Sequence, residues 1–119
     1  MNPIDSAALD TLFIKARTAN GFLDKPVPED LLRRVYEIAA LGPTSMNTQP
    51  TRYVFLNTKE ARERLLPAML PGNLDKTRSA PVTVIVATDT KFYEYMPKVW
   101  HREGAKENFE ANAALASAT

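Results

Sequence analysis

The first third of the chain repeats its hydrophobic residues at the three-to-four-residue spacing of an amphipathic helix. The first such set lies between residues 6 and 17 and comprises Ala8, Leu9, Leu12, Phe13 and Ala16. The second set follows Pro28 and two acidic residues, which suit a first helical turn, and comprises Leu31, Leu32, Val35, Ile38 and Ala39. The pair Gly42-Pro43 then ends the pattern. We therefore predict two helices, separated by a break at Asn20-Gly21.

Two later segments have the composition of strands. Residues 52–56 are rich in aromatic and β-branched side chains, and residues 81–87 are apolar at nearly every position. Because the second segment is apolar on both faces, we expect it at the centre of a sheet that is covered by helices. Between the two strands, a helix is predicted from about Thr58 to Met69, with an interruption at Pro67.

The last residues of the chain have a helical pattern but no signal that terminates a helix. Residues 107–119 contain no glycine, proline or basic cap, and two strands alone do not form an independently stable sheet. We infer a chain that lacks its C-terminal part; the alternative is a small α+β protein with a frayed, alanine-rich tail. In the first case the tail's apolar side chains lack cover, and the chain exposes a large apolar surface unless a second polypeptide or an intertwined dimer covers it. These side chains are Phe109, Ala113, Leu115 and Ala116.

Composition then excludes several classes of function. The 119 residues are 45% hydrophobic and carry a formal net charge of +1, which gives no electrostatic case for binding nucleic acid or an anionic membrane. There is no cysteine, so thiolate nucleophiles and cysteine-type metal sites are excluded. No apolar run approaches the roughly 20 residues of a membrane span, and the N-terminus lacks the features of a signal peptide. We expect a cytoplasmic protein.

Glycine and histidine usage narrows the chemistry further. The four glycines are too scattered for a dinucleotide-binding fingerprint or a Walker loop. His101 is the only histidine, so a histidine-rich metal site is excluded and no metal ligands are predicted. A serine–histidine–aspartate triad would have to use His101, which lies in a charged stretch typical of a solvated surface.

Three polar clusters remain outside the apolar helix faces: residues 16–20, residues 43–50 and residues 72–76. The middle cluster is a loop of neutral hydrogen-bonding side chains with a proline at each end, which suits the edge of a planar heterocycle better than a phosphate or a metal. Each cluster also has an ordinary structural explanation. Turn formers favour loops, a basic residue favours a helix C-terminus, and polar residues face solvent.

In their order and separations, these clusters resemble the motifs of the nitroreductase family, which are FMN-dependent NAD(P)H oxidoreductases. Residues 16–22 (ARTANGF) occupy the place of the family's "R-R-S-x-R-x-F", and residues 43–50 (PTSMNTQP) that of "P-S-S-x-N-x-Q-P". Asn73 and Lys76 match "N-x-x-K". Ala16 and Asn20 depart from the family's basic residues, as is normal in the malonic semialdehyde reductase-like branch, to which the chain is similar.

The resemblance implies a set of cofactor-binding residues and leaves the catalytic residues unassigned. The first cluster would hold the FMN phosphate and ribityl chain and approach the pyrimidine; the loop would reach FMN bound mainly by the partner subunit; the third cluster would contact the flavin ring. The implied residues are Arg17, Thr18, Asn20, Pro43, Thr44, Ser45, Asn47, Gln49, Asn73 and Lys76. We expect the first and third clusters to share one concave surface, with the loop projecting towards a partner.

The resemblance also implies the fold and the reaction. The fold would be α+β and nitroreductase-like: a central, mostly antiparallel sheet covered by helices, in an intertwined homodimer with FMN at the subunit interface. Residues 1–119 would be the N-terminal part of a single domain, inactive alone, with the C-terminal part possible as a second chain. Hydride would pass from NADH or NADPH through flavin to a malonic semialdehyde-like aldehyde, a quinone or a nitro compound. The alternative is a flavin-free interaction or scaffold domain that kept the fold without catalysis.

Overall fold

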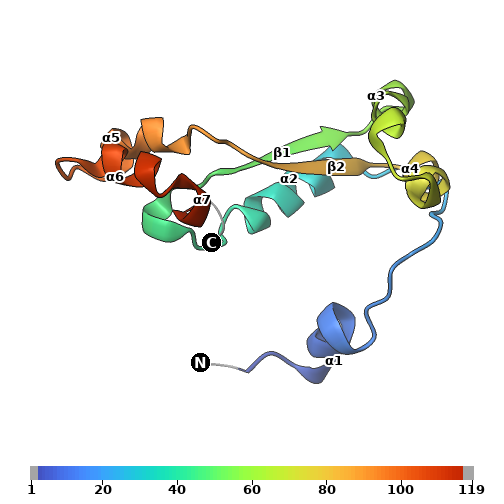
Figure 1. The fold of residues 1–119 in the computed structure, drawn as a ribbon. Coiled ribbons are helices and arrows are strands. Elements are labelled where there is room, and N and C mark those ends of the chain that lie inside the picture. The colour runs from blue at the N-terminus through green and yellow to red at the C-terminus, as the bar shows by residue number, and fades with distance from the viewer. Residues whose placement is uncertain (1–2, 117–119) are drawn as a thin grey trace.

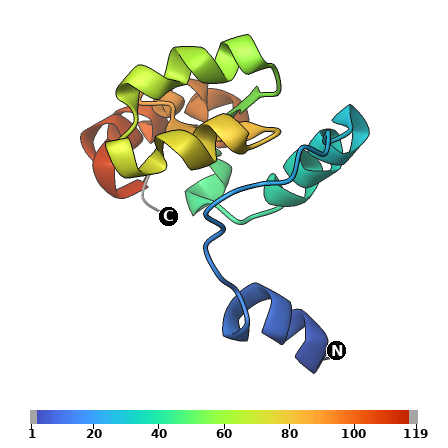
Figure 2. The same ribbon diagram turned by 90° about the vertical axis from the view of Figure 1, so that its right-hand side faces the viewer.

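The computed structural model describes residues 3–116 and begins with a helix that stands apart from the rest of the chain (Figures 1 and 2). Helix α1 (Ser6–Leu9) continues directly into a π-helical turn, η1 (Asp10–Ile14). The Asp5 carboxylate caps α1 by accepting a hydrogen bond from the Ala8 N–H at 2.7 Å. The predicted helix is therefore confirmed, although it ends at Ile14. Its apolar side chains are exposed, as Phe13 shows at 71%.

An extended segment, residues 15–28, leads from η1 to helix α2 (Glu29–Ala39). Pro28 occupies the N-cap position, and two acidic residues form the first turn, as the sequence predicts. The helix ends just before Gly42. It lies along the sheet (Figure 1), and the Tyr36 ring meets the Tyr53 ring edge-on at a centroid distance of 5.9 Å.

The sheet consists of two antiparallel strands, β1 (Thr51–Leu56) and β2 (Thr83–Thr88). Thr51 pairs with Thr88 at one end of the register, and Leu56 with Thr83 at the other. Both predicted strands are confirmed. The prediction that the second strand is buried on both faces is wrong for this chain, because Val86 is 64% exposed. Within the described residues, β1 is the only strand that pairs with β2.

A helical connection joins the two strands. It comprises α3 (Lys59–Leu65), η3 (Leu66–Ala68), η4 (Pro71–Asn73) and α4 (Leu74–Ser79). The Thr58 hydroxyl caps α3 by accepting from the Ala61 N–H at 3.2 Å. Pro67 lies at the start of η3, where the sequence predicts an interruption.

The last third of the chain folds into a small apolar core, here called the C-terminal cluster. It is built by η5 (Phe92–Tyr95), α5 (Met96–Val99) and α6 (Ala105–Ala111), and α7 (Ala113–Ala116) follows. The best-buried members are Phe92, Met96, Ala105 and Phe109. Phe109 is only 5% exposed and its ring lies 5.8 Å from that of Trp100. The expectation that nothing in the chain covers Phe109 is therefore wrong, because η5 and α5 cover it. The Leu115 and Ala116 side chains lie outside the described part.

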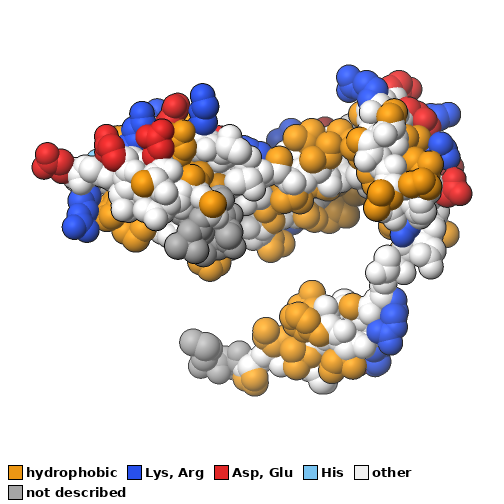
Figure 3. Space-filling view, in the orientation of Figure 1, with side chains coloured by type: hydrophobic (Ala, Val, Ile, Leu, Met, Phe, Trp, Pro, Cys, Tyr) orange, Lys and Arg blue, Asp and Glu red, His pale blue; other side chains and the backbone are white. Residues whose placement is uncertain are grey.

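The chain as a whole is extended. Its Cα radius of gyration is 18.2 Å, whereas a compact domain of this length has about 13.5 Å. Figure 3 shows hydrophobic side chains gathered over α1 and over the middle of the molecule, where α2 and the sheet lie. Exposed members include Leu12, Ile38 and Val54. The expected large apolar surface is confirmed; what covers it stays a prediction. No helix within residues 3–116 is long and apolar enough to cross a membrane.

Candidate functional site

The loop after α2 is held by its own hydrogen bonds, as the density of polar side chains in it predicts. The Thr44 hydroxyl accepts from the Gln49 backbone N–H at 3.1 Å, and the Thr44 carbonyl accepts from the Asn47 N–H at 3.1 Å. The Gln49 side-chain amide donates to the Asn47 amide oxygen at 2.8 Å. A short 3₁₀ turn, η2 (Ser45–Asn47), lies inside the loop, and the half-buried Ser45 accepts from the Thr48 N–H through its carbonyl. The donors and acceptors involved are neutral.

The loop backbone is strained. Met46, Asn47 and Gln49 have φ values of 48°, 58° and 43°. Asparagine tolerates this left-handed region, but for the other two residues it costs about 1–2 kcal/mol each. The Thr48 hydroxyl is buried and has no hydrogen-bond partner within residues 3–116. Strained residues of this kind collect at functional sites and persist only where their surroundings enforce them.

The exit of the loop is fastened to the end of β2. Pro50 is fully buried, and its carbonyl accepts from the Asp89 N–H at 2.8 Å. The Arg52 guanidinium donates through Nη1 to the Gln49 carbonyl at 2.8 Å and to the Thr51 carbonyl at 3.1 Å. Its Nη2 reaches the Asp89 carboxylate at 2.7 Å. This arrangement, here called the Arg52–Asp89 clasp, joins residues 37 positions apart.

A pocket of about 450 Å³ opens between α2, the loop and the start of β1. Thr44 and Gln49 from the loop line it, together with side chains that the sequence reasoning missed. Its remaining lining is Tyr36, Ala39, Ala40, Gly42, Thr51, Arg52 and Tyr53. The missed positions had a signal: Tyr36, Ala39 and Ala40 share a helix face by their spacing, and Arg52 and Tyr53 directly follow the loop. Since Asp89 neutralises Arg52, the pocket presents little net charge.

The other loop residues lie outside this lining. Pro43 and Asn47 are exposed, and Ser45 is half-buried. Asn47 nevertheless holds the Gln49 side-chain amide, so it orders a residue that does line the pocket. Of the five predicted loop positions, two therefore line the pocket and three do not.

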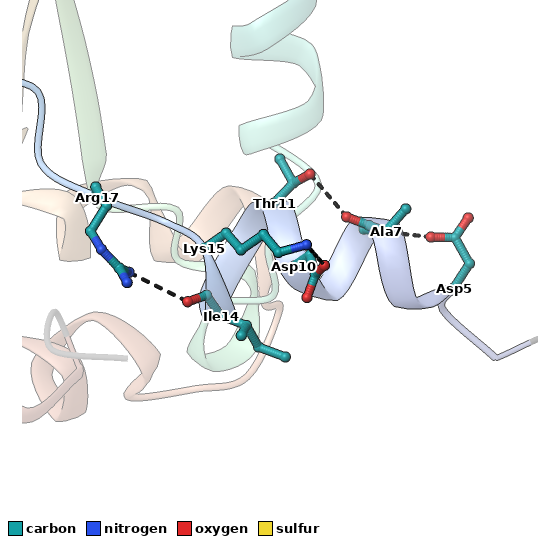
Figure 4. Close-up of polar contacts among 8 residues, drawn as sticks. Asp5, Ala7, Asp10, Thr11, Ile14, Lys15 and Arg17 are labelled. Carbon is teal, nitrogen blue, oxygen red and sulfur yellow. Dashed lines mark hydrogen bonds and ion pairs between the residues drawn. The ribbon is translucent and has the colours of Figure 1, made fainter.

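The first polar cluster makes local contacts only. Arg17, Thr18 and Asn20 lie exposed in the extended segment after η1. The Arg17 guanidinium donates to the Ile14 carbonyl at 3.4 Å (Figure 4). It also donates to the Ala16 carbonyl at 2.7 Å. A Lys15–Asp10 ion pair closes the same turn. These bonds satisfy carbonyls at the end of a helical segment, which is the ordinary structural role of a basic residue there.

The third cluster lies elsewhere. Asn73 ends η4 and Lys76 belongs to α4, and both are half-buried. Within residues 3–116, no carboxylate pairs with the Lys76 ammonium group. Figures 1 and 2 both show α1 apart from α4, and the hydrogen bonds of the Arg17 guanidinium go to the carbonyls of Ile14 and Ala16. The expected concave surface, shared by the first and third clusters, stays a prediction. Within residues 3–116 the apolar side chains of the first helix, such as Leu12 and Phe13, are exposed, so packing of these side chains does not hold the segment near α4.

The sequence model of the nitroreductase family matches residues 15–118, and the chain belongs to this family. The match includes all three polar clusters. The expected fold is likewise confirmed: the structure is α+β, with an antiparallel sheet, and its structural neighbours have the nitroreductase fold.

Over the matched region, about half of the residues in curated relatives are identical to those of this chain. A protein of Stenotrophomonas maltophilia (strain R551-3), called "Putative NADH dehydrogenase/NAD(P)H nitroreductase", is 51% identical over 107 residues, which cover 90% of this chain and 55% of the relative. A protein of Burkholderia lata with the same description is 45% identical over 119 residues, covering 100% of this chain and 61% of the relative. The chain thus spans little more than half the length of these relatives.

Solved structures agree on the fold. A nitroreductase family protein from Streptococcus pneumoniae TIGR4 superposes with a TM-score of 0.64 at 28% identity, covering 85% of this chain and 53% of that one. A structure from Exiguobacterium sibiricum 255-15, described as a nitroreductase in complex with FMN, superposes with a TM-score of 0.68 at 16% identity. The superposition covers 97% of this chain and 53% of the Exiguobacterium sibiricum chain.

Proposed function

We propose that the protein is an FMN-dependent oxidoreductase that passes a hydride from NADH or NADPH to a small acceptor. The observation that carries the proposal is the loop of residues 43–50. It is ordered by neutral hydrogen bonds, strained at Met46 and Gln49, and borders a pocket of little net charge inside the region that matches the nitroreductase family. The names of the curated relatives and the FMN complex of a solved neighbour support it.

The donor set fits FMN. An isoalloxazine edge offers neutral donors and acceptors, which amides such as Asn47, Gln49 and Asn73 can match. The FMN phosphate needs cations, and Arg17 can bind it with its two-pronged guanidinium. The Lys76 ammonium would stabilise negative charge on the ring system, and among the described residues no carboxylate neutralises it. Bound flavin would supply the capacity to accept and release hydride, which no side chain of this chain has.

The site needs more than this chain. Helix α1, which precedes Arg17, stands apart from α4, which contains Lys76, so we infer that the segment before α2 needs a supporting surface in the complete site. We propose that a homodimer supplies that surface, with FMN at the subunit interface. A second polypeptide that carries the rest of the relatives' sequence is the other arrangement that would cover the exposed apolar face.

FMN binding and NAD(P)H oxidation test the proposal. The chain would be purified alone, and also together with the part of the Stenotrophomonas maltophilia relative that it does not span. We expect the complemented form to quench FMN fluorescence and to oxidise NAD(P)H, and the isolated chain to do neither efficiently. A complemented form that folds but binds no FMN would contradict the proposal and favour the flavin-free scaffold.

A matched pair of lysine variants identifies the cation. Lys76→Gln should lower the rate of flavin reduction roughly ten-fold or more, since it removes a charge aimed at developing negative charge. Lys59→Gln, an exposed lysine at the start of α3, serves as the control and should leave the rate unchanged. Equal rates for both variants would remove Lys76 from the proposed site.

For the acceptor, we propose a small aldehyde of the malonic semialdehyde type ahead of quinones and nitro compounds, on the resemblance to that branch of the family. The test compares malonic semialdehyde, a quinone and a nitrofuran, each with NADH and NADPH. The aldehyde should show the highest kcat/KM. Equal or faster turnover of the nitrofuran would contradict this preference.

A further inference from the structure

The strained loop needs an external restraint. Its internal hydrogen bonds join Thr44, Asn47 and Gln49 to one another and fix the shape of the loop. They do not fix the loop's orientation relative to α2 and β1, between which the pocket lies. Residues with positive φ persist only where the surroundings enforce them. The contacts that leave the loop therefore decide whether Thr44 and Gln49 stay at the pocket.

The Arg52–Asp89 clasp makes several of these outward contacts. One guanidinium nitrogen holds the carbonyl of Gln49, which is the last strained residue, and the other holds Asp89. The Asp89 N–H donates to the Pro50 carbonyl, and its carboxylate accepts from the Lys91 N–H at 2.9 Å. Asp89 therefore connects the loop exit to the entry of η5 and the C-terminal cluster.

We propose that Arg52 and Asp89 are positioning residues, which hold Gln49 and Thr44 in place at the pocket and thereby set the affinity for FMN. This inference rests on the proposed function as far as FMN is concerned. The pair is partly exposed, with side-chain exposures of 47% and 24%, so it contributes little to global stability. The pair instead fixes the orientation of the strained loop, which the loop's internal hydrogen bonds alone do not fix.

Neutralisation is a second consequence of the clasp. Arg52 lines the pocket, and Asp89 cancels its charge. Removing Asp89 leaves an unpaired guanidinium at the pocket, whereas removing Arg52 leaves none. Both substitutions break the Arg52–Asp89 pair, and they change the charge at the pocket in opposite directions.

The test uses Arg52→Gln, Asp89→Asn and the double variant in the complemented protein, with Arg34→Gln as control. Arg34 forms a more exposed ion pair with Glu37, on α2, and does not line the pocket. Backbone amide hydrogen exchange of residues 46–49 reports the loop, FMN fluorescence quenching reports the affinity, and thermal melting reports stability.

We expect each clasp variant to exchange faster across residues 46–49 and to raise the Kd for FMN roughly ten-fold, the effect of losing a charge-assisted hydrogen bond. The double variant should resemble the single ones instead of multiplying their effects. Melting should match the Arg34→Gln control. Only Asp89→Asn should bind small anions such as sulfate more tightly.

Two results would overturn the inference: unchanged hydrogen exchange in both single variants, or an FMN affinity that stays the same although the loop exchanges faster. A wild-type protein that binds no FMN would defeat the proposed function instead, and the hydrogen-exchange comparison would still decide whether the clasp positions the loop.

Discussion

Helix α1 with η1 and the C-terminal cluster contain similar apolar side chains and bury them very differently. Phe13 in η1 is 71% exposed, whereas Phe109 in α6 is 5% exposed. The segments of the C-terminal cluster follow one another closely in sequence and pack against one another. The first helix is separated from the body by the extended residues 15–28, and among the described residues its side-chain hydrogen bonds stay within residues 5–17. Amphipathic spacing thus tells which face is apolar and does not tell what covers it.

The largest expected effect tests directly whether the first helix and the C-terminal cluster differ in packing. Phe109→Ala should lower the free energy of unfolding by about 3–5 kcal/mol, because it opens a cavity among well-packed rings. Phe13→Ala, the matched control, should change it by no more than about 0.5 kcal/mol in the isolated chain. Denaturant unfolding followed by circular dichroism measures both. Similar losses for the two variants would mean that the first helix is packed after all.

The next prediction asks whether a second polypeptide covers the first helix. If it does, Phe13→Ala should weaken the assembly by about 1.5–3 kcal/mol, the free energy of burying one large side chain, which is roughly a ten- to hundred-fold higher dissociation constant. Sedimentation velocity across a concentration series measures the shift. An unchanged dissociation constant would exclude the face containing Phe13 from the interface.

Two helix caps provide a smaller, paired test. Thr58→Ala removes the cap of α3, which is joined to the body through the Arg62–Pro81 hydrogen bond, and should cost about 1 kcal/mol of global stability. Asp5→Ala removes the equivalent cap of α1 and should fray that helix without moving the global transition. Unfolding curves and helical ellipticity separate the two outcomes. A shift of the transition by Asp5→Ala would show that α1 contributes to the cooperative fold.

The smallest effect concerns the ionisation of Tyr93, beside the C-terminal cluster. Burial raises the pKa of Tyr93 above its ordinary 10.0, and the carboxylates of Glu110 and Glu94 raise it further. The folded state therefore favours the protonated phenol. The resulting stability is complete below the ordinary pKa and is lost as the pH rises through the higher, folded-state pKa.

Glu110→Gln should lower the pKa of Tyr93 towards its ordinary value, since it removes one of the two carboxylates. Spectrophotometric titration of tyrosinate in the two proteins measures this. A pKa of Tyr93 that does not respond to Glu110→Gln would leave burial and the Glu94 carboxylate as the causes of its rise.

Local signals predicted the fold well where the structure is local. Pro28 and the apolar spacing after it marked α2, and the two apolar runs marked β1 and β2. The segment of η5 and α5 escaped prediction, because Pro97 and clustered aromatic residues obscure any helical period there. The burial of β2 was predicted wrongly, because within the described residues only β1 pairs with it and its Val84 and Val86 side chains are exposed.

In the candidate site, too, local features could be predicted and long-range contacts could not. The polar loop could be predicted from its composition, and two of its residues, Thr44 and Gln49, do line the pocket. The Arg52–Asp89 clasp could not, because nothing local relates residues 37 positions apart. The meeting of Arg17 with Lys76 stays a prediction that depends on a surface outside this chain. Sequence patterns specify chemical groups and local shape, and approach through space depends on packing.

The outer edge of β2 affects the solubility of the chain when it is made in a cell. In the described part of the chain this strand pairs only with β1, it contains no charged residue, and Val84 and Val86 are exposed. Such an edge invites another copy to add a strand, which is the first step of aggregation. If a partner covers this edge, as proposed above, its binding competes with self-addition from the moment of synthesis. We expect soluble yield to fall with expression level, and to recover when the part of the relatives' sequence that this chain does not span is produced at the same time.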